Sequence, residues 1–216
     1  MDFISNILQE VLNILFSFTG DFGIAIVLIT LIVKLMLMPL SLKQRFSMKK
    51  QQELAEKMEH IKEKYKDNAK ELEKQLQMHS VESMKSMIGC STILLQMPVI
   101  YALYHVCLNM PKGFTTVIIP WIANLNTADN LFILPCIYTL TMLAPNLINY
   151  IPYFKVSSHR TFNKQTIIMT TITSLIITVR TPVALGLYFI TSAIYALIEE
   201  ICFRIYFNQK NKLVLK

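Results

Sequence analysis

A single lysine lies inside a long apolar stretch near the start of the chain. Lys34 is close to the middle of residues 22–42, and a helix of about 20 such residues crosses a bilayer. An ammonium group at the bilayer centre costs about 2.5–3.5 kcal/mol on insertion scales, so water, a polar partner or an incoming acidic group must reach it. The chemistry that Lys34 can perform is therefore electrostatic, since a fixed charge in a low dielectric attracts acidic groups at short range.

Other polar residues lie at similar depth in apolar stretches. With a rise of about 1.5 Å per residue, Lys34 and Gln96 each lie about 12 Å from the nearer end of their own stretch. Thr30 is one helical turn from Lys34 on the same face. Two later stretches carry hydroxyl groups at helical spacing. From these patterns we predict a polar groove formed by Lys34, Thr30, Gln96, Thr171, Ser174, Tyr188 and Ser192.

Each of these residues also has a simpler structural explanation. Serine and threonine in membrane helices usually bond their own backbone or a neighbouring helix. Lys34 reaches an interface by snorkelling if the span begins three or four residues away from where we place it. A buried ion pair is the third explanation, but Glu199 and Glu200 fall near the end of the last stretch and not at the depth of Lys34.

The composition indicates a membrane protein. The chain is 53% hydrophobic and 16% charged, its mean hydropathy is +0.44, and its charges are clustered. We therefore predict an all-α polytopic fold with five transmembrane helices and one cytoplasmic helical hairpin. The spans are expected at residues 22–42, 88–108, 131–151, 165–180 and 182–203. The expected domains are an extracytoplasmic segment 1–20, a core 21–207 that includes the hairpin 43–85, and a basic tail 208–216.

The basic residues predict the orientation. Residues 43–85 hold 11 of the 21 lysines and arginines, and the loop 152–164 and the tail add more. Short basic loops stay in the cytoplasm, so we expect the N-terminus outside and the C-terminus in the cytoplasm. The net charge of +7 is then a topology signal that also suits anionic lipid headgroups, and we expect no specific nucleic-acid site.

Two polar or amphipathic segments accompany the spans. Residues 43–85 have the pattern of two charged helices with thin apolar stripes, which turn near Asp67. They are either a solvated antiparallel hairpin or a docking arm for a ribosome, nascent chain or other partner. Residues 3–15 show helical apolar periodicity, which predicts a short amphipathic helix on the outer membrane surface.

The sequence lacks the patterns of an enzyme. There is no Gly-rich phosphate loop, the 4 histidines are dispersed, and the 4 cysteines have no metal or disulfide spacing. We therefore expect no catalytic residues, no metal and no cofactor. A small transporter or channel that uses Lys34 as a substrate or ion site is the alternative, although the chain shows no internal repeat and has only 5 glycines.

Three motifs resemble one known family. Residues 30–40 (TLIVKLMLMPL) resemble the first core span of the YidC/Oxa/Alb membrane protein insertases. The second core span of the family is similar to Gly89-Cys90 followed by residues 94–98 (LLQMP). The last core span is similar to Leu187-Tyr188-Phe189 together with Ser192. The resemblance runs from about residue 20 to 205, and LLQMP is its most specific part.

The resemblance implies an insertase that takes hydrophobic segments from the cytosol and releases them sideways into lipid, alone or with the Sec translocon. Its partners would be newly made membrane proteins. The ribosome would be a further partner, in contact with the hairpin. In this family a basic groove residue on the first span contacts the incoming segment, and Lys34 holds that position. Lys34 replaces the usual arginine, and Thr92 replaces a proline. The resemblance is to the shorter type found in Gram-positive bacteria, without a large extracytoplasmic domain.

Overall fold

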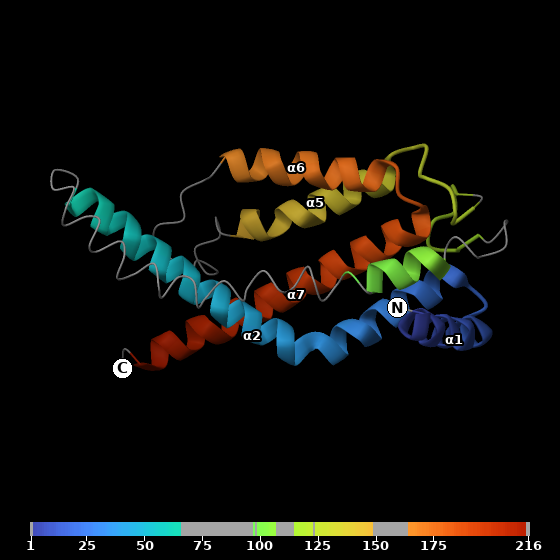
Figure 1. Ribbon diagram of the computed structural model, residues 1–216, viewed down its shortest axis with the longest axis horizontal. Coiled ribbons are helices and arrows are strands. Elements are labelled where there is room, and N and C mark those ends of the chain that lie inside the picture. The colour runs from blue at the N-terminus through green and yellow to red at the C-terminus, as the bar shows by residue number, and fades with distance from the viewer. Residues whose placement is uncertain are drawn as a thin grey trace. The chain divides into compact units, whose positions relative to one another are not determined.

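The computed structural model describes residues 2–65, 97, 99–106, 115–122, 124–148 and 164–214. In these ranges the regular elements are helices, apart from one isolated bridge between Ala128 and Pro182. The prediction of an all-α chain is confirmed for this part of the protein. The helices are α1 (Asp2–Thr19), α2 (Phe22–Lys64), α5 (Ile133–Ile148), α6 (Lys164–Val179) and α7 (Val183–Val214), and residues 99–106 are also helical (Figure 1).

The chain forms two compact units, Met1–Met36 together with Pro98–Lys216, and Leu37–Met97. In the second unit, α2 continues without a break through Pro39 to Lys64. The predicted first helix of the hairpin is thus an extension of the helix that carries the first apolar stretch. The remainder of the hairpin lies outside the described residues, as does Gln96.

Within the described residues, two helices are long and apolar enough to cross a membrane. They are the stretches Phe22–Lys50 of α2, with 29 residues, and Val183–Gln209 of α7, with 27. They correspond to the first and last predicted spans. The stretches predicted at 131–151 and 165–180 are helical as α5 and α6, each with 16 residues in the described part of the chain. At about 1.5 Å per residue, these residues cover about 24 Å of a hydrocarbon core that is about 30 Å thick. Most of the stretch at 88–108 is outside the described residues, so the count of five spans stays a prediction.

The predicted basic tail is helical over most of its length. Helix α7 continues to Val214, so most of residues 208–216 extends the last helix. Lysine is a good helix former, and its charge is favourable near a helix C-terminus, which explains why the helix outlasts its apolar stretch.

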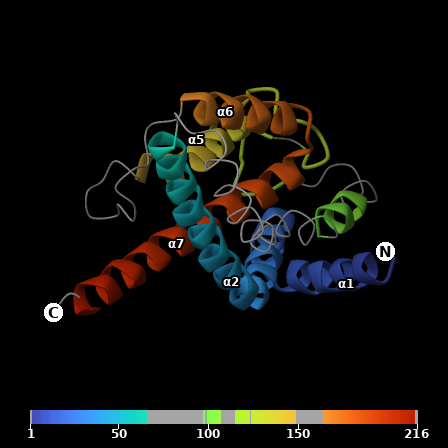
Figure 2. The ribbon, with the colours of Figure 1, turned by 60° about the vertical axis from the view of Figure 1, so that its left-hand side comes forward.

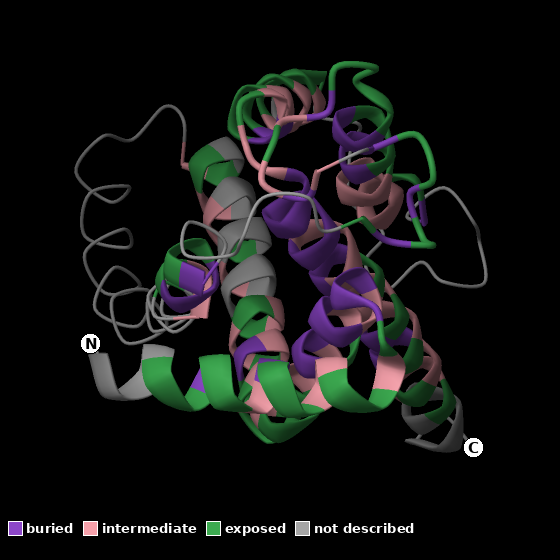
Figure 3. Ribbon diagram, turned by 90° about the vertical axis from the view of Figure 1, so that its right-hand side faces the viewer, coloured by how far each residue is buried: buried purple, intermediate pink, exposed green. Residues whose placement is uncertain are grey.

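An apolar core holds the first unit together. Leu8 and Leu12 of α1 pack in one cluster with Ile26 of α2, with Leu103 of the helical residues 99–106, and with Tyr188 of α7. The predicted N-terminal helix is confirmed, and its buried stripe faces this core while its outer side is exposed (Figure 3). Whether α1 lies on the outer membrane surface stays a prediction.

Helix α5 packs against both α6 and α7 (Figures 1 and 2). The ring of Tyr138 on α5 lies 5.6 Å, between centroids, from the ring of Phe189 on α7. Helix α5 therefore shares packing contacts with both of the helices that follow it in the sequence.

Candidate functional site

The predicted groove residues of α2 have different surroundings. Thr30 is buried, and its hydroxyl donates a hydrogen bond to the Ile26 carbonyl at 2.6 Å. Lys34, one turn later, is half-buried. The Thr30 oxygen keeps lone pairs that can accept a further hydrogen bond, since a hydroxyl has one donor and two acceptor sites. Thr30 thus remains able to contribute polarity beside Lys34.

The predicted hydroxyl stripe of α6 takes part in helix packing. Ser174 Oγ is buried 3.0 Å from Thr139 Oγ1 on α5, and the Thr171 hydroxyl donates to the Ile167 carbonyl at 2.8 Å. Thr139 in turn donates to the Pro135 carbonyl at 2.8 Å. For Ser174 the structure supports the simpler explanation, a bond between neighbouring helices.

The two predicted residues of α7 are on the buried side of that helix. Tyr188 and Ser192 are separated by one turn, and both are buried. Tyr188 belongs to the same apolar cluster as Ile26 and Ile29 of α2. The structure therefore brings the Tyr188 face of α7 and the beginning of α2 into one core. Nothing is described for Gln96, so the complete groove stays a prediction.

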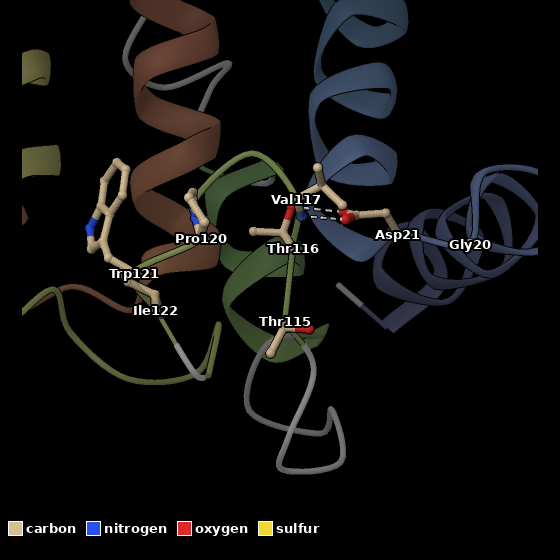
Figure 4. A pocket seen from close by; sticks show the side chains of 8 residues that line it. All are labelled: Gly20, Asp21, Thr115, Thr116, Val117, Pro120, Trp121 and Ile122. Atoms are coloured by element: carbon tan, nitrogen blue, oxygen red, sulfur yellow. Dashed lines mark hydrogen bonds between the residues drawn. The ribbon is translucent and has the colours of Figure 1, made fainter.

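A second polar site, absent from the sequence prediction, lies where α2 begins. Helix α1 ends at Thr19 and is followed by Gly20, whose φ of 68° is the left-handed conformation that glycine adopts readily. Asp21 follows and caps α2, because its carboxylate accepts a hydrogen bond from the Ile24 amide at 3.0 Å. The same carboxylate accepts bonds from the Thr116 hydroxyl at 2.8 Å and the Val117 amide at 2.7 Å (Figure 4).

The surroundings of Asp21 favour its charged form. Burial raises the pKa of the Asp21 carboxyl, but hydrogen bonds from Val117, Ile24 and Thr116 outweigh burial, and the pKa lies below its usual 3.8. Gly23 permits this arrangement, since a Cβ atom there would lie only 2.2 Å from Thr116 Oγ1. These groups border a hollow of about 560 Å³ lined by Gly20, Asp21, Thr115, Thr116, Val117, Pro120, Trp121 and Ile122 (Figure 4).

The same loop supports two further helices. We call residues 115–122 and 124–132 the capping loop. The buried carboxylate of Asp129 accepts bonds from the Leu131 amide at 3.1 Å and the Leu134 amide at 2.8 Å, at the start of α5. The Val183 amide donates to the Thr127 carbonyl at 2.9 Å, and the adjacent amide of α7 donates to the Leu125 carbonyl at 3.0 Å.

The capping loop therefore supplies acceptors to the first amides of α5 and α7, and it donates hydrogen bonds to the Asp21 carboxylate that caps α2. A helix leaves its first amides without internal partners, and burying them unpaired is costly. Sequence reasoning missed this role. An aspartate directly before an apolar helix is a signal for a cap, but the partner of Asp21 lies 95 residues away in the sequence.

Comparison with known proteins assigns the chain to a family. The model of the family described as "60Kd inner membrane protein" matches residues 14–211. Among similar curated proteins is "Membrane protein insertase YidC" of Campylobacter jejuni, 39% identical over 151 residues, which cover 68% of this chain and 28% of that protein. The proteins of the same name from Helicobacter pylori and Aquifex aeolicus are 38% identical over 132 residues and 40% identical over 130 residues. These matches cover 61% and 60% of this chain, and 24% and 26% of the two relatives. The chain thus matches only about a quarter of the length of these relatives.

Proposed function

Because this chain belongs to the 60Kd inner membrane protein family, which is the family of the YidC/Oxa/Alb insertases, we propose that it is itself a membrane protein insertase. The observation that carries the proposal is the membership itself, over residues 14–211. The family and the two long apolar helices indicate a multi-pass protein of the bacterial inner membrane. Its clients would be newly made membrane proteins.

The position of Lys34 supports a mechanism based on a charged groove. Lys34 lies inside the 29-residue apolar stretch of α2, one turn after the buried Thr30. A half-buried ammonium in such a stretch attracts an acidic or polar end of an incoming segment more strongly than it would in bulk water. A lysine side chain at the centre of a membrane span costs about 2.5–3.5 kcal/mol on insertion scales. Ionisable residues are kept at this depth chiefly where they serve a function.

In this mechanism the groove holds the polar end of a client only briefly. Polarity in the groove is supplied by Lys34, Thr30, Gln96, Thr171, Tyr188 and Ser192, whereas the Ser174 hydroxyl is used in the contact with Thr139. The apolar part of the client then moves sideways into lipid, and each buried CH₂ group contributes about 0.8 kcal/mol of driving force. The cytoplasmic hairpin and the end of α7 would receive the client, and the protein would act alone or beside a ribosome or the Sec translocon. In this topology the N-terminus of the protein is outside the cell and its C-terminus is in the cytoplasm.

The mechanism is tested by inserting a short single-span client into vesicles that contain only this protein. We expect Lys34→Arg to retain insertion and Lys34→Leu to lose most of it, because only the first keeps the charge. Lys164→Leu is the matched control, since Lys164 is an exposed lysine at the start of α6. Lys34→Glu should reverse the preference from clients with an acidic end to clients with a basic end.

Two results would contradict these expectations. Equal insertion by wild type and Lys34→Leu would retain the insertase proposal and remove Lys34 from the mechanism. If folded wild type inserted no client, but its vesicles conducted ions or took up a small solute in a Lys34-dependent way, the transporter alternative would replace the insertase.

A further inference from the structure

The capping loop lies at the level where the apolar stretches of two long helices begin. Asp21 directly precedes Phe22, the first residue of the apolar stretch of α2, and its carboxylate bonds Thr116 and Val117. The apolar stretch of α7 begins at Val183, whose amide bonds Thr127. If α2 and α7 cross the bilayer, these contacts hold the loop at the boundary between hydrocarbon and headgroups.

Two short runs of this loop expose large apolar side chains. In the first run Val117 is 81% exposed, and Ile118 and Trp121 are also exposed. In the second run Leu131 is 61% exposed and is followed by the exposed Phe132. Clustered exposed apolar groups on a protein usually mark an interaction surface. Figure 4 shows that the Trp121 ring points away from the Asp21 carboxylate, whereas Thr116 and Val117 face that carboxylate.

The backbone of the second run is held in an uncommon conformation. Phe132 has a φ of 56°, which few residues other than glycine adopt, and its amide donates to the Asp129 carbonyl at 3.2 Å. Such a conformation costs about 1–3 kcal/mol and persists only where its surroundings enforce it. Here the cap made by the buried Asp129 carboxylate fixes the turn that presents Phe132.

From this arrangement we propose that the two exposed runs of the capping loop are a membrane anchor, in which Trp121 and Phe132 lie among the lipid headgroups. The depth of the loop identifies a bilayer as the occupant, since it is tied to the first residues of two apolar stretches. The chemistry agrees. Residues 115–133 contain one charged residue, Asp129, which is buried and hydrogen-bonded, and aromatic rings are enriched at membrane–water interfaces. The anchor would fix the height of the capping loop, and through it the starts of α2, α5 and α7.

The chain provides its own probe, because Trp121 is the only tryptophan. The experiment is fluorescence quenching of the full protein in phosphatidylcholine vesicles, with a spin label either just below the headgroup or at the end of the acyl chain. We expect stronger quenching by the shallow label than by the deep one, blue-shifted emission, and little quenching by aqueous iodide. This readout needs no insertion activity, so it succeeds or fails independently of the proposed function.

Two outcomes would overturn the anchor. Emission of a hydrated indole, quenched by iodide and by neither lipid label, would show that the loop faces water or a soluble partner. Strongest quenching by the deep label would place the ring in hydrocarbon, away from the headgroups. As a second test, Val117→Gln should weaken shallow quenching, while Asn130→Gln, at an exposed polar position of the same loop, should not. Unchanged quenching in Val117→Gln would contradict a contact of Val117 with lipid.

Discussion

Asp21 should contribute more to stability than any exposed acidic residue, because three groups share its carboxylate. Loss of an N-cap costs about 1 kcal/mol. The bonds from Thr116 and Val117 each involve a charged acceptor, for which about 1.5–3 kcal/mol is typical. Since bonds to one carboxylate are not additive, we expect Asp21→Ala to lower the free energy of unfolding by about 3–5 kcal/mol.

Asp21→Asn separates the cap from the charge. The amide oxygen of asparagine can still accept the bond from Ile24, but its NH₂ group cannot accept one from the Val117 amide. We therefore expect a smaller loss, about 2 kcal/mol, which corresponds to one charged hydrogen bond.

The pH dependence follows from the direction of the pKa shift. The folded-state pKa of Asp21 is lowered, so its contribution to stability is present above the usual pKa of 3.8 and is lost as pH falls through the lower folded value. The difference in stability between wild type and Asp21→Asn should therefore be constant near neutral pH and shrink below about pH 4.

The assay is reversible unfolding in detergent, followed by the fluorescence of Trp121, together with hydrogen exchange of residues 115–122. Exchange at the Val117 amide should become faster in both variants, because this amide loses its acceptor. Glu10→Gln is the matched control, since Glu10 is an exposed acidic residue on the neighbouring α1. If Asp21→Ala were as stable as Glu10→Gln, or if exchange of Val117 were unchanged, the capping network described here would be wrong.

Two further predictions concern close contacts between segments. Gly23→Ala should destabilise the protein by about 1–3 kcal/mol in the same unfolding assay, because the added methyl group overlaps Thr116. In a Thr116→Gly background this overlap is absent, so Gly23→Ala should cost less there. An equal cost in both backgrounds would contradict the steric explanation. Ser174→Ala should cost about 0.6 kcal/mol, an average value for hydrogen bonds between membrane helices, through loss of the contact with Thr139. A double-mutant cycle with Thr139→Ala measures that pair, and a coupling energy of zero would show that α5 and α6 are held by apolar packing alone.

The local pattern of the sequence was sufficient to predict the helices and the polar residues within them. The apolar run around Lys34 predicted α2, the periodicity of residues 3–15 predicted α1, and the last apolar run predicted α7. Such predictions succeed because a helix bonds its own backbone, and its apolar face repeats within a few residues. The family was also accessible from the sequence, since its motifs are short and contiguous.

Only the tertiary structure decided which polar groups meet. Thr116 and Asp21 are 95 residues apart, and Ser174 and Thr139 are 35 apart, yet each pair is within hydrogen-bonding distance. Periodicity describes one helix at a time and contains no information on which loop reaches which helix end. For this reason the sequence predicted Ser174 as a groove residue, whereas its contact with Thr139 joins two helices, and Asp21 passed unnoticed although it ties the capping loop to α2. Contacts of this kind depend on the packing of distant segments, because the partner of a buried carboxylate is chosen by proximity in space.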